Sequence, residues 1–153
     1  MHIEKIEDRM TRRVHAVRPL DSIQHAREIM VTHRLNQLPV LADGHLVGIV
    51  TDRDLRDAFP SVFESTPRVP PHRTAANTDP KDIRVEEVMT ANVLTLQPHD
   101  SLIDAARLMR RERIGAVPIV EGQRVIGILT RSDVLDAFVA LADKTFPDTP
   151  PAA

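Results

Sequence analysis

Two short segments of the sequence place a threonine three residues before an aspartate: Thr51 and Asp54 in GIVTDRD, and Thr130 and Asp133 in GILTRSD. In each segment an aliphatic run stops at the threonine and an apolar helical pattern follows, which predicts a strand leading directly into a helix. The start of a helix offers unpaired backbone N–H groups and the positive end of the macrodipole, both of which attract phosphate. The two segments therefore indicate two binding sites for a phosphorylated ligand.

The same residues also have a purely structural explanation. A threonine followed three residues later by an acidic residue is a capping box, worth typically about 1 kcal/mol for the cap alone, and it needs no ligand. Ligand binding is favoured by the presence of two copies. It is also favoured by the glycine before each threonine, Gly48 and Gly127, which would let a ligand approach the strand closely. Both explanations stay open on the sequence alone.

An internal repeat organises the chain around these segments. A shift of 79 positions aligns Met10–Phe59 with Met89–Phe138 without a gap. Two copies in one frame are one supersecondary unit used twice, which predicts a pseudo-twofold arrangement with two equivalent candidate sites. Between the copies, Val62-Phe63 is the one piece of the linker predicted to be ordered. The predicted domains are a first repeat over 1–59, a Pro-rich linker over 60–80, a second repeat over 81–142 and a disordered tail over 143–153.

Each copy is predicted to contain a strand, a helix, two further strands and a second helix, so the fold class is mixed α/β (α+β). A short helical lead-in precedes each copy, and Phe59 and Phe138, at the same repeat position, are predicted to pack in the core. Asp-Gly between two apolar runs predicts the first hairpin. In the first copy the predicted strands are 14–17, 38–41 and 46–50, and the predicted helices run from Asp21 or Ser22 to about Arg34 and onward from Thr51. In the second copy the predicted strands are 93–96, 117–120 and 125–129, and the predicted helices are 101–113 and Thr130 to about Leu141. A Ser101–Asp104 capping box is predicted at the start of the helix over 101–113.

The composition excludes several classes of protein. The 20 basic and 22 acidic residues give a net charge of -2, without the positive excess that coats nucleic acid. The charged amino terminus does not resemble a signal peptide, and no stretch approaches about 20 apolar residues, so no membrane association is expected. The absence of cysteine excludes disulfides and fits a cytoplasmic location. A soluble cytoplasmic protein is expected.

No pattern in the sequence predicts catalysis or a metal site. The chain lacks a Ser-His-Asp order, a P-loop, cysteine and a His-x-x-x-His motif. His25 and His33 stand eight residues apart without a ligating partner at the i+4 position, so they are predicted to be solvated or half-buried. The expectation is a protein that is not an enzyme, with no catalytic residue, no catalytic cofactor and no metal.

The repeated pattern resembles that of a known family. Two βαββα units, each with a Met-Thr lead-in, an aliphatic-Pro-aliphatic strand and a Gly-x-x-Thr-x-x-Asp motif, look like a pair of CBS domains (a Bateman module) over roughly residues 1–142. Within that family, TDRDL (51–55) followed by FPSVFE (59–64) resembles the CBS half of the acetoin-utilisation accessory (AcuB-like) proteins. The resemblance implies tandem repeats packed as one pseudo-twofold module, with no extra domain.

The resemblance also implies an adenosine ligand in a cleft between the two repeats. In such modules the motif aspartate accepts hydrogen bonds from the ribose hydroxyls, the motif threonine and the helix start hold phosphate, and backbone beside the aliphatic-Pro strand contacts adenine. The ligand-binding residues implied are Val14, Gln37, Leu38, Pro39, Thr51, Arg53 and Asp54 for one site, and Val93, Ala116, Val117, Pro118, Thr130, Arg131 and Asp133 for the other.

The function implied is regulatory. Such a module senses AMP, ADP or ATP, or else NAD or S-adenosylmethionine, and signals to a regulated protein by conformational change, for example in energy sensing. Apolar helix faces around Leu55, Leu135 and Phe138 are more than a small monomer can cover, which predicts a disc-shaped homodimer. The alternative is a ligand-free module for dimerisation or protein interaction.

Overall fold

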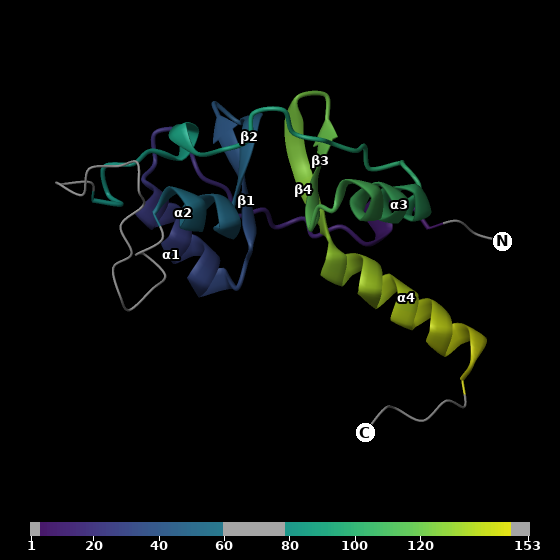
Figure 1. Ribbon diagram of the computed structural model, residues 1–153. Helices are drawn as coiled ribbons and strands as arrows, with labels where there is room; N and C mark the ends of the chain where they lie inside the picture. Colours follow the sequence, from purple (N-terminus) through teal and green to yellow (C-terminus); the bar gives the residue numbers. More distant parts are fainter. Residues whose placement is uncertain (1–3, 60–78, 148–153) are drawn as a thin grey trace, which may run out of the picture. The chain divides into compact units, whose positions relative to one another are not determined.

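The computed structural model describes residues 4–59 and 79–147, and the chain divides into two compact units (Figure 1). One unit holds His15–Leu94, and the other holds Met1–Val14 together with Thr95–Ala153. Most of the predicted linker, including Val62-Phe63, lies outside the described residues. Each unit thus combines the helices and hairpin of one copy with the residues that precede the other copy.

The unit of His15–Leu94 contains the two helices and the hairpin that the sequence predicts. Its first helix begins after Ser22, whose Oγ accepts the N–H of His25 at 3.1 Å, and ends where Arg34 adopts a left-handed φ of 55°. The two strands pair antiparallel. The elements are α1 (Ile23–His33), β1 (Gln37–Ala42), β2 (His45–Thr51), α2 (Asp52–Ala58) and the short 3-10 helix η3 (Val85–Glu87).

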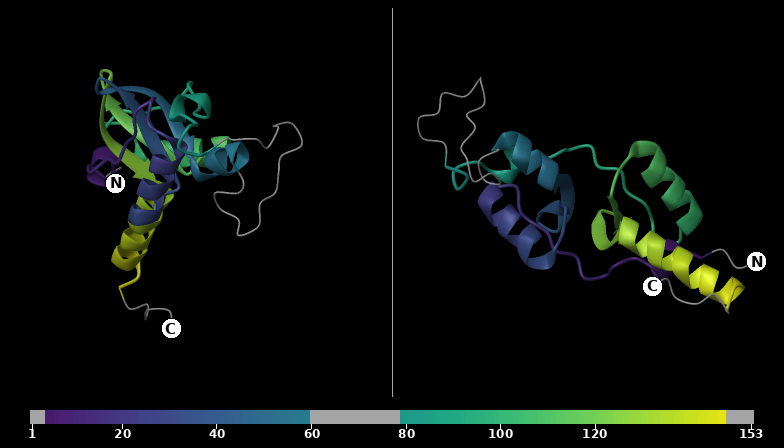
Figure 2. Two further views of the ribbon diagram at one scale, coloured as in Figure 1. Left: turned by 90° about the vertical axis from the view of Figure 1, so that its left-hand side faces the viewer. Right: turned by 60° about the horizontal axis from the view of Figure 1, so that its bottom comes forward.

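The other unit repeats this arrangement with a longer last helix, and Figure 2 shows α4 extending well past α3. The helix predicted to end near Leu141 continues to Thr145, so it includes residues 143–145, which the sequence assigned to the tail. The capping box predicted at Ser101 is only half formed, because the Asp104 carboxylate instead pairs with Arg107 at 3.0 Å. The elements are η1 (Ile6–Asp8), α3 (Leu102–Glu112), β3 (Ala116–Glu121), β4 (Arg124–Thr130) and α4 (Arg131–Thr145).

Both hairpins turn on residues with positive φ. Asp43 and Gly44 have φ values of 51° and 79°, as both central residues of a type I′ turn require. In the second hairpin Gly122 has a φ of 63° and the following Gln123 does not have a positive φ, as in a type II′ turn. These turns set the register that brings each motif threonine opposite the first residue of its partner strand, with Thr51 facing Gln37 and Thr130 facing Ala116.

The strands predicted over 14–17 and 93–96 are reduced to single parallel bridges. Val17 bridges Val40, and Leu96 bridges Ile119. The N–H of Val17 donates to the carbonyl oxygen of Pro39 at 3.0 Å. The prediction of full strands is wrong, because a proline follows two residues after each bridge and cannot continue a ladder.

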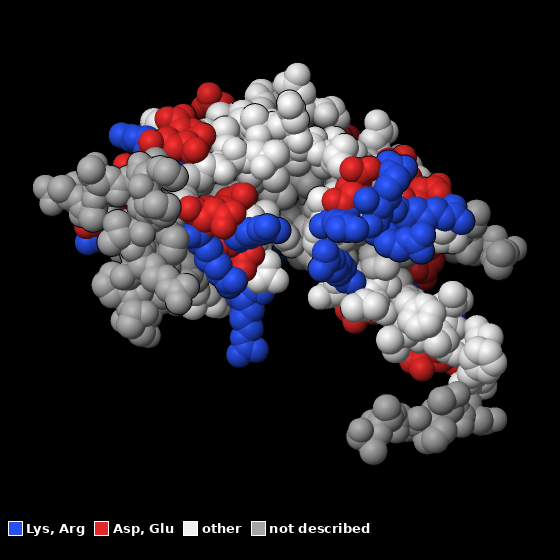
Figure 3. Space-filling model, in the orientation of Figure 1, with Lys and Arg blue, Asp and Glu red and all other residues white. Residues whose placement is uncertain are grey.

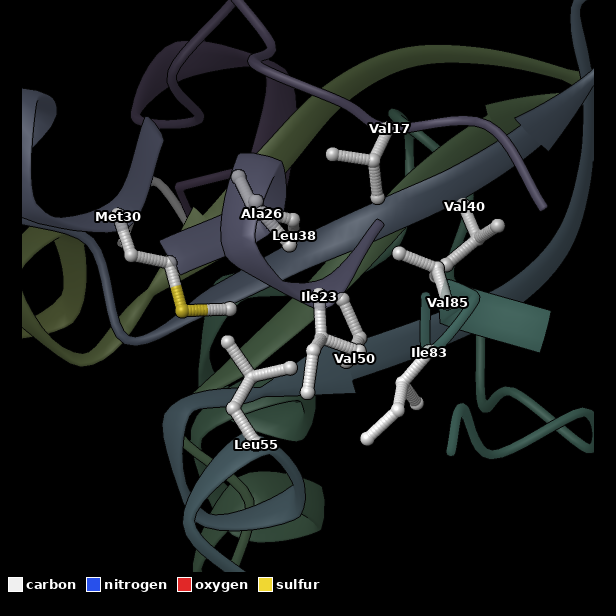
Figure 4. Packing of buried hydrophobic residues seen from close by; sticks show 10 residues of the cluster. All are labelled: Val17, Ile23, Ala26, Met30, Leu38, Val40, Val50, Leu55, Ile83 and Val85. Atoms are coloured by element: carbon white, nitrogen blue, oxygen red, sulfur yellow. The ribbon is translucent and has the colours of Figure 1, made fainter. Parts of the chain in front are cut away.

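The core of the His15–Leu94 unit draws on the residues before the second copy (Figure 4). Ile23 and Met30 of α1 and Leu55 of α2 pack over the hairpin, and Ile83 and Val85 close the cluster. Val85 also donates its N–H to the carbonyl oxygen of Asp21 at 2.8 Å. The short segment around η3 is therefore an integral part of this core.

The core of the other unit uses the amino-terminal segment in the same way. Ile6 and Met10 pack with Met109 of α3 and Leu129 of β4. The backbone is fixed as well, since the N–H groups of Ile6 and Glu7 donate at 3.0 Å to the carbonyl oxygens of residues 100 and 98. The predicted amphipathic lead-in thus supplies core residues to the unit that contains the second hairpin.

The glycines before the motif threonines make room for these lead-in segments. A Cβ placed on Gly48 would lie 2.5 Å from Sδ of Met89 and 3.0 Å from the carbonyl oxygen of Thr90. A Cβ on Gly127 would lie 2.6 Å from Sδ of Met10. The sequence predicted that a ligand would approach the backbone at Gly48 and Gly127. The side chains of Met89 and Met10, each from the same unit as the glycine, occupy that space instead.

Gly48→Ala is expected to destabilise the protein by about 1–2 kcal/mol, as an extra methyl group in a packed core does. The Met89 thioether can swing aside, but the Thr90 carbonyl is backbone and cannot do so without moving its strand pairing with Ile49. Urea unfolding measures the loss. The penalty should shrink in a Met89→Ala background, and an equal penalty in both backgrounds would contradict this assignment.

Phe138 lies on the surface, with 65% of its area exposed, and the prediction that it packs in the core is wrong. Its repeat equivalent Phe59 packs against the core of its own unit. The difference follows from helix length, because α4 has 15 residues and α2 only seven. Phe59 follows the last residue of α2, whereas Phe138 lies inside α4, where the helix continues.

A bidentate ion pair ties together the residues that flank η1. Arg9 donates from Nη2 and Nε to the two carboxylate oxygens of Glu4 at 2.7 and 3.0 Å. This hydrogen bonding lowers the pKa of Glu4 below its ordinary value.

Stability is therefore expected to depend on Glu4 at low pH. A carboxyl group with a lowered pKa stabilises the folded state fully above its unfolded pKa, and the contribution disappears as the pH falls through the folded value. Glu4→Gln should make the loss of stability between about pH 5 and pH 3 shallower. Thermal melts over that range measure the slope, and identical slopes in both proteins would rule out the contribution.

Candidate functional site

Thr51 caps α2 and forms a complete capping box with Asp54. Thr51 Oγ1 accepts the N–H of Asp54 at 3.1 Å, and Oδ2 of Asp54 accepts the N–H of Thr51 at 2.8 Å. Both side chains are half-buried. Oδ1 of Asp54 has no hydrogen-bond donor among residues 4–59 and 79–147. One oxygen of this carboxylate is thus left to accept from a ligand.

Thr130 and Asp133 repeat the box at the start of α4, with an addition. Oδ2 of Asp133 accepts the N–H of Thr130 at 2.7 Å and its hydroxyl at 2.9 Å. Thr11, from the amino-terminal segment of the same unit, donates its hydroxyl to Oδ1 of Asp133 at 3.2 Å. Both oxygens of Asp133 are engaged, so the two copies of the site are not equivalent.

The helix starts offer fewer free N–H groups than the sequence suggested. The first N–H of α2, on Asp52, donates to the carbonyl oxygen of Asn36 at 2.8 Å, and that of α4, on Arg131, donates to Gly115 at 3.1 Å. The third is held by the capping threonine. Only the second, on Arg53 or Ser132, lacks an acceptor in the described part of the chain. Each helix start can therefore give a phosphate one backbone donor.

The residues implied as contacts for adenine differ in what they can present. Leu38 and Val117 are fully buried in the cores of their units, so only their backbone could face a ligand. The carbonyl oxygens of Pro39 and Pro118 already accept from Val17 and Leu96. Gln37 is half-buried at the start of β1, and its equivalent Ala116 is buried.

The remaining predicted site residues are spread over both units. Val14 and Val93 are both half-buried. Val14 is predicted to share a site with Thr51 and Asp54 but belongs to the other compact unit, and Val93 is likewise in a different unit from Thr130 and Asp133. Arg53 is exposed and lies 4.0 Å from Asp57 on the same helix. Arg131 is exposed at the start of α4.

Thr11 is the residue that the sequence prediction missed. The signal was present, since the Met-Thr pair that opens each copy recurs at Met89-Thr90. Its use could not be deduced, because the equivalent Thr90 makes no side-chain hydrogen bond to Asp54 among the described residues. The contact depends on packing between segments 122 residues apart.

The described residues contain neither a metal-binding cluster nor a membrane-spanning helix. No group of three or more His, Asp or Glu side chains is placed to hold a metal ion there. No helix within residues 4–59 and 79–147 has the length and apolar character needed to cross a membrane.

Comparison with known sequences identifies relatives of the whole repeat. The CBS domain family matches residues 3–61 and 85–140. The chain is 34% identical over 137 residues to MJ1225 of Methanocaldococcus jannaschii, and spans about half of that protein (47%). It is 31% identical over 132 residues to the CBS domain-containing protein YhcV of Bacillus subtilis, covering 86% of this chain and 84% of YhcV.

Solved structures show the same fold. The acetoin utilization protein AcuB of Vibrio cholerae superimposes with a TM-score of 0.76 at 25% identity, over 97% of this chain and 100% of AcuB. CBSX2, in complex with AMP, superimposes with a TM-score of 0.71 at 30% identity, over 90% of this chain and 97% of CBSX2. The CBS pair of MJ0100, in complex with 5′-methylthioadenosine and S-adenosyl-L-methionine, superimposes with a TM-score of 0.70 at 26% identity. The match covers 92% of this chain and 99% of the MJ0100 pair. The chain belongs to the CBS domain family and contains a CBS domain pair.

Proposed function

We propose that this chain is a regulatory module, not an enzyme, that binds adenosine-containing ligands at its two Thr-x-x-Asp segments and passes the signal to a partner protein. CBS pairs of this fold bind such ligands: AMP in CBSX2, and 5′-methylthioadenosine with S-adenosyl-L-methionine in MJ0100. The observation that carries the proposal is the open Oδ1 of Asp54, held beside a helix start by a capping box that uses only Oδ2. A carboxylate oxygen in this position suits a ribose diol.

The residues take separate roles in this proposal. Asp54 and Asp133 accept from ribose, and Thr51 and Thr130 with the second N–H of each helix hold phosphate. Arg53 and Arg131 add positive charge at the two helix starts. The remaining contacts are with adenine and are made by Val14, Gln37, Leu38 and Pro39 at one site and by Val93, Ala116, Val117 and Pro118 at the other.

Direct binding tests the proposal. Calorimetric titration with AMP, ATP and S-adenosylmethionine is expected to give saturable binding of at least one of them. The protein has no Trp or Tyr, so adenine carried through purification would also dominate its ultraviolet spectrum. A nucleotide-free protein that binds none of the three ligands would favour the second candidate, a ligand-free interaction module, since both capping boxes are complete without a ligand.

The proposed assembly is a homodimer. Phe138, Val139 and Leu141 of α4 are each more than half exposed, an apolar surface that association would cover. Light scattering at micromolar concentration should give about twice the 17.1 kDa of one chain. Phe138→Ser should shift the mass toward the monomer, whereas a monomer mass for the unchanged protein would rule out the dimer.

A further inference from the structure

A pocket of about 550 Å³ lies between α3 and α4 of the second copy. Three arginines line it: Arg110 and Arg113 from the end of α3, and Arg131 from the start of α4. The rest of the lining is apolar and includes Met109 and Val134. The volume lies in the range of pockets that bind small molecules.

The three arginines in the pocket differ from their neighbours on α3. Arg107 pairs with Asp104 at 3.0 Å, and Arg111 pairs with Glu112 at 2.7 Å. Arg110, Arg113 and Arg131 have no ion pair or side-chain hydrogen bond within the described part of the chain. Figure 3 shows Lys and Arg side chains gathered over the region of α3. Among the arginines of α3 and of the residues that flank it in the fold, those without an ion pair are therefore the ones that line the pocket.

Helix stability does not account for this cluster. Arginine near the end of α3 is favoured by the helix dipole, which explains Arg110 and Arg113 singly. Arg131 is the first residue of α4, where the positive end of the dipole disfavours a cation. A guanidinium cannot give up its proton in a protein, so all three groups keep their positive charge around the pocket.

We propose that this pocket binds an anion carrying phosphate groups, with at least two negative charges. Guanidinium groups match phosphate oxygens with paired hydrogen bonds, and three of them around one pocket suit a di- or triphosphate better than a single carboxylate. The apolar lining accommodates a less polar remainder of the ligand.

The pocket is separate from the Thr130–Asp133 site. Arg131, Val134 and Leu135 stand at i, i+3 and i+4 positions and share one face of α4. Asp133, two residues after Arg131, points to the other side of the helix. The pocket therefore does not depend on adenosine binding at Asp133, although Arg131 could serve either site.

The first copy has no equivalent cluster. The repeat shift of 79 positions places Val31 at the position of Arg110 and Asp52 at that of Arg131, and keeps only Arg34 for Arg113. Asp52 also pairs with Arg56 at 3.1 Å. One arginine-lined pocket of this kind per chain is therefore expected.

Inorganic tripolyphosphate, which has no adenosine, is the probe. Calorimetry at low salt should show one site per chain, weakened by added salt. The double variant Arg110→Gln, Arg113→Gln should lose at least about tenfold in affinity, the worth of one hydrogen bond to a charged group. The matched control Arg107→Gln, Arg111→Gln removes the same charge from the same helix, and its affinity should stay within about twofold because its arginines are already paired.

Three results would overturn the proposal: no binding of tripolyphosphate to the unchanged protein, equal losses in the two double variants, or loss of tripolyphosphate binding in a folded Asp133→Ala protein. Thermal melts establish that each variant is folded. Failure of AMP binding would count against the proposed function alone, since AMP and tripolyphosphate are titrated separately.

Discussion

Ile6→Ala is expected to destabilise the protein by about 2–5 kcal/mol, the usual cost of truncating a fully buried aliphatic side chain. Ile6 has 0% of its surface exposed, although it lies only a few residues from the amino terminus. It packs with Leu102, Met109 and other core residues of the second copy. Urea unfolding monitored by far-ultraviolet circular dichroism measures the loss.

Ile103→Ala is the matched control for this prediction. It makes the same chemical change in the same unit, but Ile103 is 50% exposed on α3. Its effect should stay within about 0.5 kcal/mol, as for most surface substitutions. A cost below about 1 kcal/mol for Ile6→Ala would show that the amino-terminal segment is not part of this core.

The regular elements of the fold could be predicted because their signals are local. Ser22 caps α1, Asp43-Gly44 turns the first hairpin and Thr130 caps α4, and each is decided by residues within four positions. The two caps also recur in the repeat, since Ser101 caps α3 and Thr51 caps α2. The family followed from the same local patterns, since their order within each copy is what the CBS domain match covers.

The destination of the lead-in segments could not be predicted from local signals. The alignment of the two copies places Met10 before the first and Met89 before the second. It does not say that Met10 packs beside Gly127, or Met89 beside Gly48. The repeat alignment also does not show that α4 is longer than α2. For this reason Phe59 and Phe138 were predicted to have the same role, although only Phe59 packs against a core.

The hydrogen bonds of the candidate site could not be predicted from the sequence. Which oxygen of an aspartate remains open depends on contacts between distant segments, as with Thr11 and Asp133. The helix starts were expected to present several free N–H groups. Asn36 and Gly115 take one at each site, because the chain before β1 and β3 lies against the start of the following helix.

Asp54→Ala is expected to weaken AMP binding at the first site by about 1.5–3 kcal/mol, or roughly 10- to 150-fold, the worth of hydrogen bonds to a charged group. Asp133→Ala should cost less at the second site. A ribose hydroxyl there competes with the Thr11 hydroxyl for Oδ1, so part of the gain from binding is offset by roughly the 0.5–1.5 kcal/mol of a neutral hydrogen bond.

Titration calorimetry on the two single variants decides between a binding role and a purely structural one. Either substitution also removes half of a capping box, so thermal melts must show that the protein remains folded. Asp57→Ala is the matched control, because it removes an exposed carboxylate from α2 that makes only a 4.0 Å pair with Arg53. If neither Asp54→Ala nor Asp133→Ala changes the affinity more than Asp57→Ala does, these aspartates only cap their helices. The adenosine-sensing proposal should then be abandoned, because it depends on a carboxylate oxygen that the ligand uses.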